Sequence, residues 1–142
     1  MAAEKQQHCL TVEEANKRLP LVRVIVGDIM KLFPDVHDRR RRLEEIRSQS
    51  DSSEQESDHA AEVRQVEQQL ETDIERLEGI LDELRELGAE LKDPVRGLVD
   101  FRSVIDDREV WLCWQPGENE IMFWHELDAG FAGRQSLMQV SR

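Results

Sequence analysis

The chain has 142 residues and a mass of 16.6 kDa, enough for one domain or for one compact domain with an extended arm. It carries 19 basic and 31 acidic residues, a formal net charge of −12, and a chain this acidic repels the phosphates of DNA and RNA. The sequence has no apolar run of membrane-spanning length and no signal-peptide pattern, and its two cysteines cannot form a disulfide framework or a four-cysteine zinc site. We therefore expect a cytoplasmic protein that neither enters membranes nor binds nucleic acid generally.

The first predicted element is a long helix that begins near residue 11. Thr11 and Glu14 form a capping-box pattern, in which each side chain satisfies the other residue's backbone amide. Apolar residues then recur every three or four positions to about residue 33, and a sparser pattern continues to Ile46. Pro20 and Pro34 fall inside this pattern, so we expect a kink or a helix restart at the first and a second kink at the other.

A second helix is predicted over residues 63–91, after an exposed, mobile turn near residues 48–60 that lacks apolar side chains in its centre. A branched apolar residue recurs every seven positions, as in a coiled-coil seam: Val63, Leu70, Leu77, Leu84 and Leu91. The stripe must pack against the first helix, folded back as an antiparallel hairpin, or against another copy of the chain. The four leucines are therefore also the candidate oligomer seam. Asp73 interrupts the seam, where it either fixes the register or yields the buried place to Ile74.

The C-terminal third predicts β-strands, because six of the seven aromatic residues lie after residue 97. Strands are expected over residues 98–105, 110–114 and 121–125, with polar turns between them. The middle strand is apolar on both faces, so the hairpin should cover one face of the sheet and the C-terminal segment or a second subunit the other.

The sequence thus predicts an α+β protein packed as one domain. Residues 1–97 form a long antiparallel, coiled-coil-like helical hairpin, and residues 98–142 form a three-stranded antiparallel meander with an irregular C-terminal segment. The surplus of apolar surface favours a homo-oligomer, most simply a dimer.

Four stretches, residues 11–20, 91–101, 111–114 and 124–134, together resemble the bacterial family known as domain of unknown function 2203. The most specific are Gly-Leu-Val-Asp-Phe at 97–101 and Trp-His-Glu-Leu-Asp-Ala-Gly-Phe-Ala-Gly-Arg at 124–134. The resemblance runs from about residue 10 to residue 135. It implies a small bacterial cytoplasmic protein but supplies no activity, since the family is named for lacking one.

The residues best suited to metal chemistry lie at the end of the third predicted strand. His125, Glu126 and Asp128 offer imidazole and carboxylate ligands for zinc or manganese, and Asp100 joins them if the first and third strands approach each other. The same groups would suit a general base with a carboxylate partner, although the metalloprotease pattern HExxH is absent. The alternative is a hydrogen-bonded structural His125 on an apolar strand face, with carboxylates that only cap a turn.

Two further polar groups are candidates for binding. Gly130, Gly133 and Arg134 fit either an anion-binding nest or a tight turn whose arginine pairs with a carboxylate. Lys92, Asp93 and Arg96 form a candidate polar cluster in a stretch that carries the family resemblance.

Other reactive or charged residues have simpler explanations. Cys113 lies between two tryptophans in a core strand and should behave as a small apolar residue, and Cys9 has no evident base nearby. The basic run at residues 39–42 is better explained by charge pairing near the hairpin tip than by nucleic-acid binding.

The leading functional hypothesis is a non-enzymatic, homo-oligomeric interaction or scaffold module, with a further protein partner open. The alternative is a metal-binding protein or a metal-dependent hydrolase that uses His125, Glu126, Asp128 and Asp100 with zinc or manganese. No residue is assigned a catalytic role.

Overall fold

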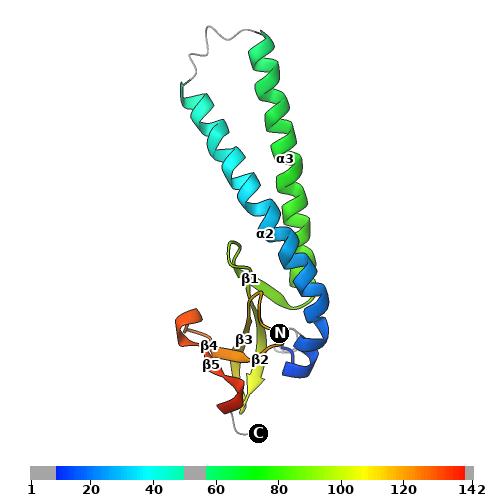
Figure 1. Ribbon diagram of the computed structural model, residues 1–142, viewed down its shortest axis with the longest axis vertical. Helices are drawn as coiled ribbons and strands as arrows, with labels where there is room; N and C mark the ends of the chain where they lie inside the picture. Colours follow the sequence, from blue (N-terminus) through cyan, green and yellow to red (C-terminus); the bar gives the residue numbers. More distant parts are fainter. Residues whose placement is uncertain (1–8, 50–56, 140–142) are drawn as a thin grey trace, which may run out of the picture.

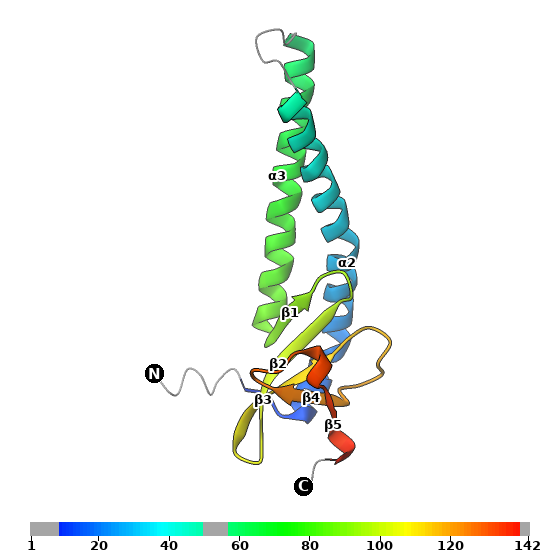
Figure 2. The same cartoon turned by 90° about the vertical axis from the view of Figure 1, so that its left-hand side faces the viewer.

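The computed structural model describes residues 9–49 and 57–139. Two helices, α2 (Val12–Gln49) and α3 (Ser57–Glu86), precede the strands β1 (Ala89–Asp93), β2 (Leu98–Ile105), β3 (Arg108–Trp114) and β4 (Phe123–Glu126). The chain ends with the short 3-10 helix η2 (Phe131–Gly133), strand β5 (Gln135–Ser136) and the 3-10 helix η3 (Leu137–Gln139). The helices form a hairpin that rises far beyond the sheet (Figure 1, Figure 2). The predicted α+β class is confirmed. Residues 50–56, the centre of the turn expected near residues 48–60, lie outside the described residues.

Helix α2 begins at the predicted capping box. The amide of Thr11 donates to Glu14 Oε1 at 2.9 Å, and the amide of Glu14 donates to Thr11 Oγ1 at 3.0 Å. The helix then continues through Pro20 and Pro34 without a break, so no restart occurs. Its first turns bend beside the sheet (Figure 1), where buried side chains on both sides of Pro20 hold it in place. None of the described helices is both long and apolar enough to cross a membrane.

Helix α3 ends earlier than predicted. Gly88 adopts a φ of +88°, which terminates the helix, and Arg18 Nη1 donates to the carbonyl of Leu87 at 2.9 Å. Leu91, expected in the helix, therefore lies in β1. Leu70 packs with Val36 and Leu43 in a separate cluster of the hairpin, whereas Leu77 and Leu84 belong to the main core.

Asp73 is paired rather than rotated out of the hairpin. Its Oδ2 lies 2.5 Å from Arg39 Nη2, which also lies 2.9 Å from Asp35 Oδ2. The hydrogen bond from Arg39 lowers the pKa of Asp73 below its ordinary value. The first arginine of the basic run therefore neutralises carboxylates of the hairpin itself.

Replacing Asp73 with asparagine should lower the stability at neutral pH. Because its folded-state pKa is lowered, Asp73 contributes stability above its unfolded pKa of about 3.9, and that stability disappears as the pH falls through the folded-state pKa. Urea unfolding across this range should show a deficit that shrinks with acidification. Asp82→Asn, which removes an exposed pair with Arg85 on the same helix, should have a smaller effect. An Asp73→Asn deficit of equal size at about pH 7 and about pH 2.5 would contradict this account.

The described residues form an antiparallel meander of five strands in the order β1-β2-β3-β4-β5, so the prediction of three strands is wrong. β2 covers residues 98–105 as predicted, whereas β3 begins two residues before the predicted 110–114 and β4 begins two residues after the start of the predicted 121–125. The additional strands lie at the two edges. β1 occupies positions that the leucine repeat assigned to the helix, and β5 has only two residues, too few to show strand periodicity.

A two-residue turn sets the register of the central hairpin. Asp106 and Asp107 have φ values of 53° and 64°, the left-handed conformation that tight β-hairpin turns require. The flanking residues Ile105 and Arg108 pair directly, and the register that follows places Asp100 opposite Cys113.

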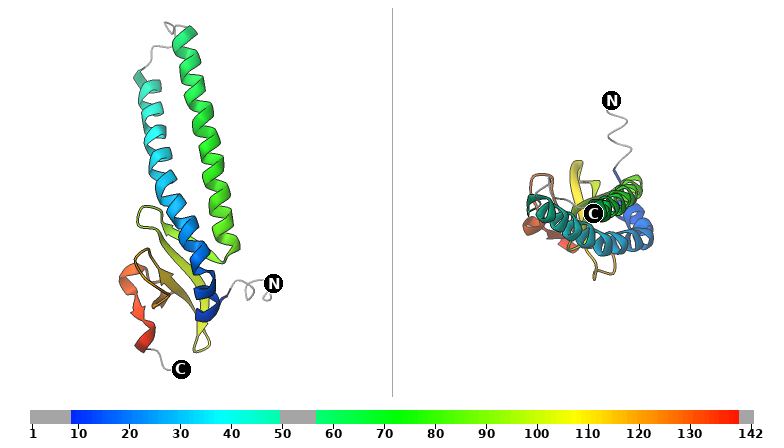
Figure 3. Two further views of the ribbon diagram at one scale, coloured as in Figure 1. Left: turned by 45° about the vertical axis from the view of Figure 1, so that its right-hand side comes forward. Right: turned by 90° about the horizontal axis from the view of Figure 1, so that it is seen from above.

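The sheet has one face for the helices and one for the C-terminal segment. Residues of α2 pack with Phe101, Leu112, Trp114 and their neighbours in the main core. Paired residues project to the same side of a sheet, so Asp100, Cys113 and Phe123 lie on the opposite face. There the Arg134 guanidinium carbon is 4.0 Å from the ring centre of Phe123. Figure 3 shows the sheet between the first part of α2 and the C-terminal segment.

Candidate metal centre

Three side chains from three adjacent strands meet on the sheet face away from the helices. Asp100 comes from β2, Cys113 from β3 and His125 from β4, and their potential ligand atoms all lie within 4.8 Å of one another. The residues are 2%, 0% and 3% exposed, respectively. The sheet therefore encloses a carboxylate, a thiol and an imidazole in one buried cluster.

The meander does not separate Asp100 from His125, although β3 runs between their strands. His125 pairs with Trp111, two residues from Cys113, so its imidazole lies diagonally across β3 from Asp100. The long side chain spans this diagonal, and His125 Nε2 lies 3.0 Å from Asp100 Oδ2.

The hydrogen bond of the other ring nitrogen, Nδ1, indicates which nitrogen of His125 carries a hydrogen. Nδ1 lies 2.8 Å from the backbone carbonyl of Glu126. Because a carbonyl can only accept a hydrogen bond, we assign a hydrogen to Nδ1, and the hydrogen bond between Nε2 and Asp100 Oδ2 then requires a second proton, shared between these two atoms. A backbone carbonyl that orients an imidazole in this way is a recurrent feature around metal-ligating histidines.

Burial governs the protonation of the other two groups. It raises the pKa of Asp100, and the nearby His125 opposes this effect. Burial, with a smaller contribution from Asp100, also raises the pKa of Cys113 to about 12. Asp100 Oδ1 has no hydrogen-bond partner among the described residues. The cluster thus retains a thiol proton and one unsatisfied carboxylate oxygen.

The cluster does not have the geometry of a cysteine nucleophile with its base. Both nitrogens of His125 are engaged, one by Asp100 and one by Glu126, so neither is left to take the thiol proton. A pKa of about 12 also disfavours the thiolate that would attack a substrate.

The donor set does fit a transition metal. One thiolate, one imidazole and one carboxylate are ligands that Zn²⁺ accepts, and the thiolate makes zinc a better match than manganese, which prefers oxygen ligands. Two members of the cluster also have features of metal ligands: Asp100 has an oxygen without a hydrogen-bond partner, and the ring orientation of His125 is fixed by the Glu126 carbonyl.

The structure brings together only part of the predicted metal site. Asp100 and His125 meet, as the sequence allowed. Glu126 instead lies at the surface, 3.0 Å from Arg108, and Asp128 is exposed. Cys113 was interpreted as an apolar core residue and was missed as a donor. The signal that could have found it is the hairpin register, which places it directly opposite Asp100.

The glycine-rich segment forms a tight turn. Phe131–Gly133 is the short helix η2. Arg134 Nη2 lies 2.7 Å from Oε2 and 2.8 Å from Oε1 of Glu118. Anion binding by Arg134, Gly130 and Gly133 stays a prediction, and an anion would have to compete with Glu118.

The candidate polar cluster is spread over two elements: Lys92 and Asp93 end β1, and Arg96 lies in the turn between β1 and β2. Asp93 Oδ1 accepts the amides of Val95 and Arg96 and so caps this turn. The Lys92 ammonium lies 4.3 Å from the ring centre of Trp111. The Arg96 guanidinium lies over a different ring, that of Phe131.

Fold and site together define an α+β protein in which a helical hairpin backs a five-stranded sheet, counted over the described residues, and the sheet holds a buried Asp–Cys–His cluster. The family described as "Uncharacterized conserved protein (DUF2203)" matches residues 8–137, and the chain belongs to this family. No curated protein and no solved structure matches the chain significantly.

Proposed function

We propose that the protein binds one Zn²⁺ ion through Asp100, Cys113 and His125. The observation that carries the proposal is the convergence of a carboxylate, a thiol and an imidazole nitrogen within 4.8 Å on three adjacent strands. These donor types are ones that zinc sites use, and three protein donors would leave the fourth tetrahedral position to a water molecule.

The electrostatics of the apo cluster support the proposal. Burial raises the pKa of Asp100 and Cys113, so both ionised forms are costly without a compensating cation. A divalent cation would displace the thiol proton, balance the carboxylate and contact the oxygen that now lacks a partner.

Metal binding is proposed without hydrolysis. Catalytic zinc sites also combine three protein donors with a fourth position, but that position must be reached by the substrate, and all three donors here are almost completely buried. A buried ion would tie β2, β3 and β4 together and so stabilise the sheet.

Elemental analysis of untagged protein tests the proposal. We expect about one zinc per chain after dialysis against zinc, and a thermal stabilisation that corresponds to about 2.7 kcal/mol when free zinc is about 100 times Kd. Cys113→Ala and Asp100→Asn should lose both effects while circular dichroism shows them folded. Cys9→Ala, which changes the cysteine outside the cluster, should bind as the wild type does.

The absence of zinc from the wild-type protein, together with no thermal shift on adding zinc or manganese, would contradict the proposal. Equal binding by Cys113→Ala and the wild type would also contradict it, because the ion would then lie elsewhere.

A non-enzymatic interaction role is the second candidate. The observation that favours it is the helical hairpin, which extends well beyond the sheet (Figure 1; Figure 3, left). Its form suits a surface that meets another protein or a second copy of the chain. The oligomeric state of the protein in solution tests this role.

A further inference from the structure

Strand β1 leaves one edge of the sheet unpaired in the described part of the chain. β1 is the first strand of the sheet order and bonds only to β2, whereas the strand at the opposite edge, β5, has two residues. An edge strand presents backbone amides and carbonyls that can pair with another strand. With five residues, β1 is the longer of the two edge strands.

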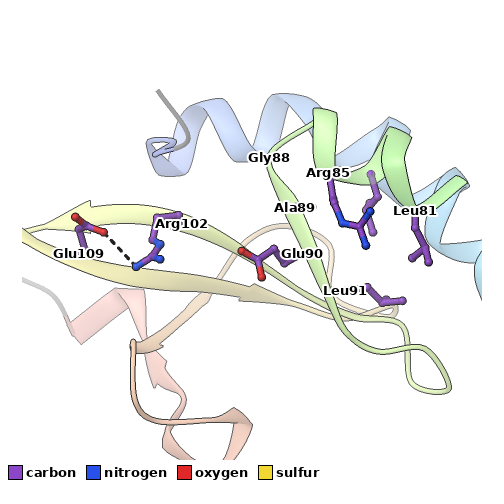
Figure 4. Close-up of a pocket in the computed structure, with 9 residues that line it drawn as sticks. Leu81, Arg85, Gly88, Ala89, Glu90, Leu91, Arg102 and Glu109 are labelled. Atoms are coloured by element: carbon purple, nitrogen blue, oxygen red, sulfur yellow. Dashed lines mark hydrogen bonds and ion pairs between the residues drawn. The ribbon is translucent and has the colours of Figure 1, made fainter. Parts of the chain in front are cut away.

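A groove runs beside this edge, beneath the end of α3. It has a volume of about 740 Å³. Its apolar lining includes Leu81 and Leu84 from α3 and Leu91 from β1. Figure 4 shows Leu81 and Leu91 directed toward the same space, with charged side chains around it. The groove thus offers apolar contact next to unpaired backbone, which is what an added strand requires.

The charges around the groove are balanced in an otherwise acidic protein. Arg85 and Arg102 offset Glu90 and Glu109, and Arg102 already lies 3.1 Å from Glu109. Two copies of a chain with a net charge of −12 repel each other over most of their surface. This groove is a place where that repulsion is small.

The sequence of β1 is complementary to itself. Glu90 and Lys92 flank Leu91, and an antiparallel pair of β1 strands centred on Leu91 sets each Glu90 opposite the other copy's Lys92. A pairing centred on Glu90 would set two glutamates face to face. The β1–β2 register shifts between Leu91 and Asp93, so Lys92 has no directly paired residue on β2. Its ammonium lies 3.5 Å from Glu90 Oε1 of its own chain, a contact that the dimer would exchange for Glu90 of the second copy.

We propose that β1 pairs antiparallel with β1 of a second copy of this chain across a two-fold axis at Leu91, joining two sheets into one. Leu70, Leu77 and Leu84 are buried within the chain, so the leucine seam needs no second copy to cover it. Of the four seam leucines, Leu91 is the one that lies on this edge.

Multi-angle light scattering at tens of micromolar should give the wild-type protein a mass of twice 16.6 kDa. Glu90→Lys and Lys92→Glu each place like charges opposite each other twice per dimer, so each should shift the protein to monomer. The double variant, which exchanges the two charges, should restore the dimer. Glu78→Lys makes the same charge change on an exposed position of α3 outside the groove and should remain dimeric.

A wild-type monomer would overturn the proposal, whether β1 then stays free or is covered by another partner. Single variants that remain dimeric would overturn it too, because the dimer would then use another surface. Failure of the double variant to dimerise while it remains folded would overturn the register.

Discussion

Glu118→Ala should lower the free energy of unfolding by about 3–5 kcal/mol, because it leaves the buried charge of Arg134 without its partner. Both side chains of this ion pair are only 12% exposed, and the guanidinium lies 4.0 Å from the ring centre of Phe123. Glu118 Oε1 also accepts the amide of Gln115 at 3.1 Å. The variant therefore removes the contacts that hold Arg134 of the C-terminal segment to the turn after β3, and one hydrogen bond within that turn.

Urea unfolding at one fixed protein concentration measures this effect. Glu126→Ala is the matched control, since it deletes the same side chain from an exposed pair with Arg108 and should cost less than about 1 kcal/mol. The control should also bind zinc normally, because only its backbone carbonyl touches His125. Similar losses in the two variants would show that Arg134 does not depend on Glu118.

Gly97→Ala should lower the free energy of unfolding by about 2–5 kcal/mol, because alanine is strained in a left-handed backbone conformation and because its Cβ atom overpacks the site. Gly97 has a φ of +73° in the turn between β1 and β2. A Cβ atom there would lie 2.6 Å from Met30 Sδ and 2.9 Å from Pro116 Cγ and from Val26 Cγ1. Methionine can move aside, but the turn proline and the buried helix valine are constrained.

The control for this variant is Gly79→Ala. Gly79 lies on an exposed part of α3, and a Cβ atom would meet nothing within 4 Å. Alanine should stabilise the helix there by about 0.5–1 kcal/mol. A Gly97→Ala protein as stable as the wild type would show that the turn can move away from α2 at little cost.

Local patterns predicted much of the fold. The capping box placed the start of α2, and the run of strand-forming residues at 98–105 placed β2. β1 was missed because Leu91 continues the seven-residue repeat of α3 even though it lies in a strand. Gly88 was the available signal that the helix had ended, since glycine commonly takes the left-handed position after a helix.

The candidate site was predictable only in part. His125 and Asp100 stand out because polar residues are rare in apolar strands. Cys113 does not, because cysteine is common in cores. Its place beside Asp100 depends on the two-residue turn at Asp106 and Asp107, a pair that lacks the glycine of the strongest hairpin signals. The approach of His125 across β3 depends on side-chain reach and sheet twist, which no local pattern encodes.

The most direct test of the central claim is the absorption spectrum of the protein loaded with one equivalent of Co²⁺, an ion that takes similar nitrogen and sulfur ligands to zinc. Coordination by Cys113 predicts an intense thiolate-to-cobalt charge-transfer band in the wild type and in Cys9→Ala, and its loss in Cys113→Ala. A wild-type spectrum without this band, or an undiminished band in Cys113→Ala, would contradict a metal centre at Asp100, Cys113 and His125.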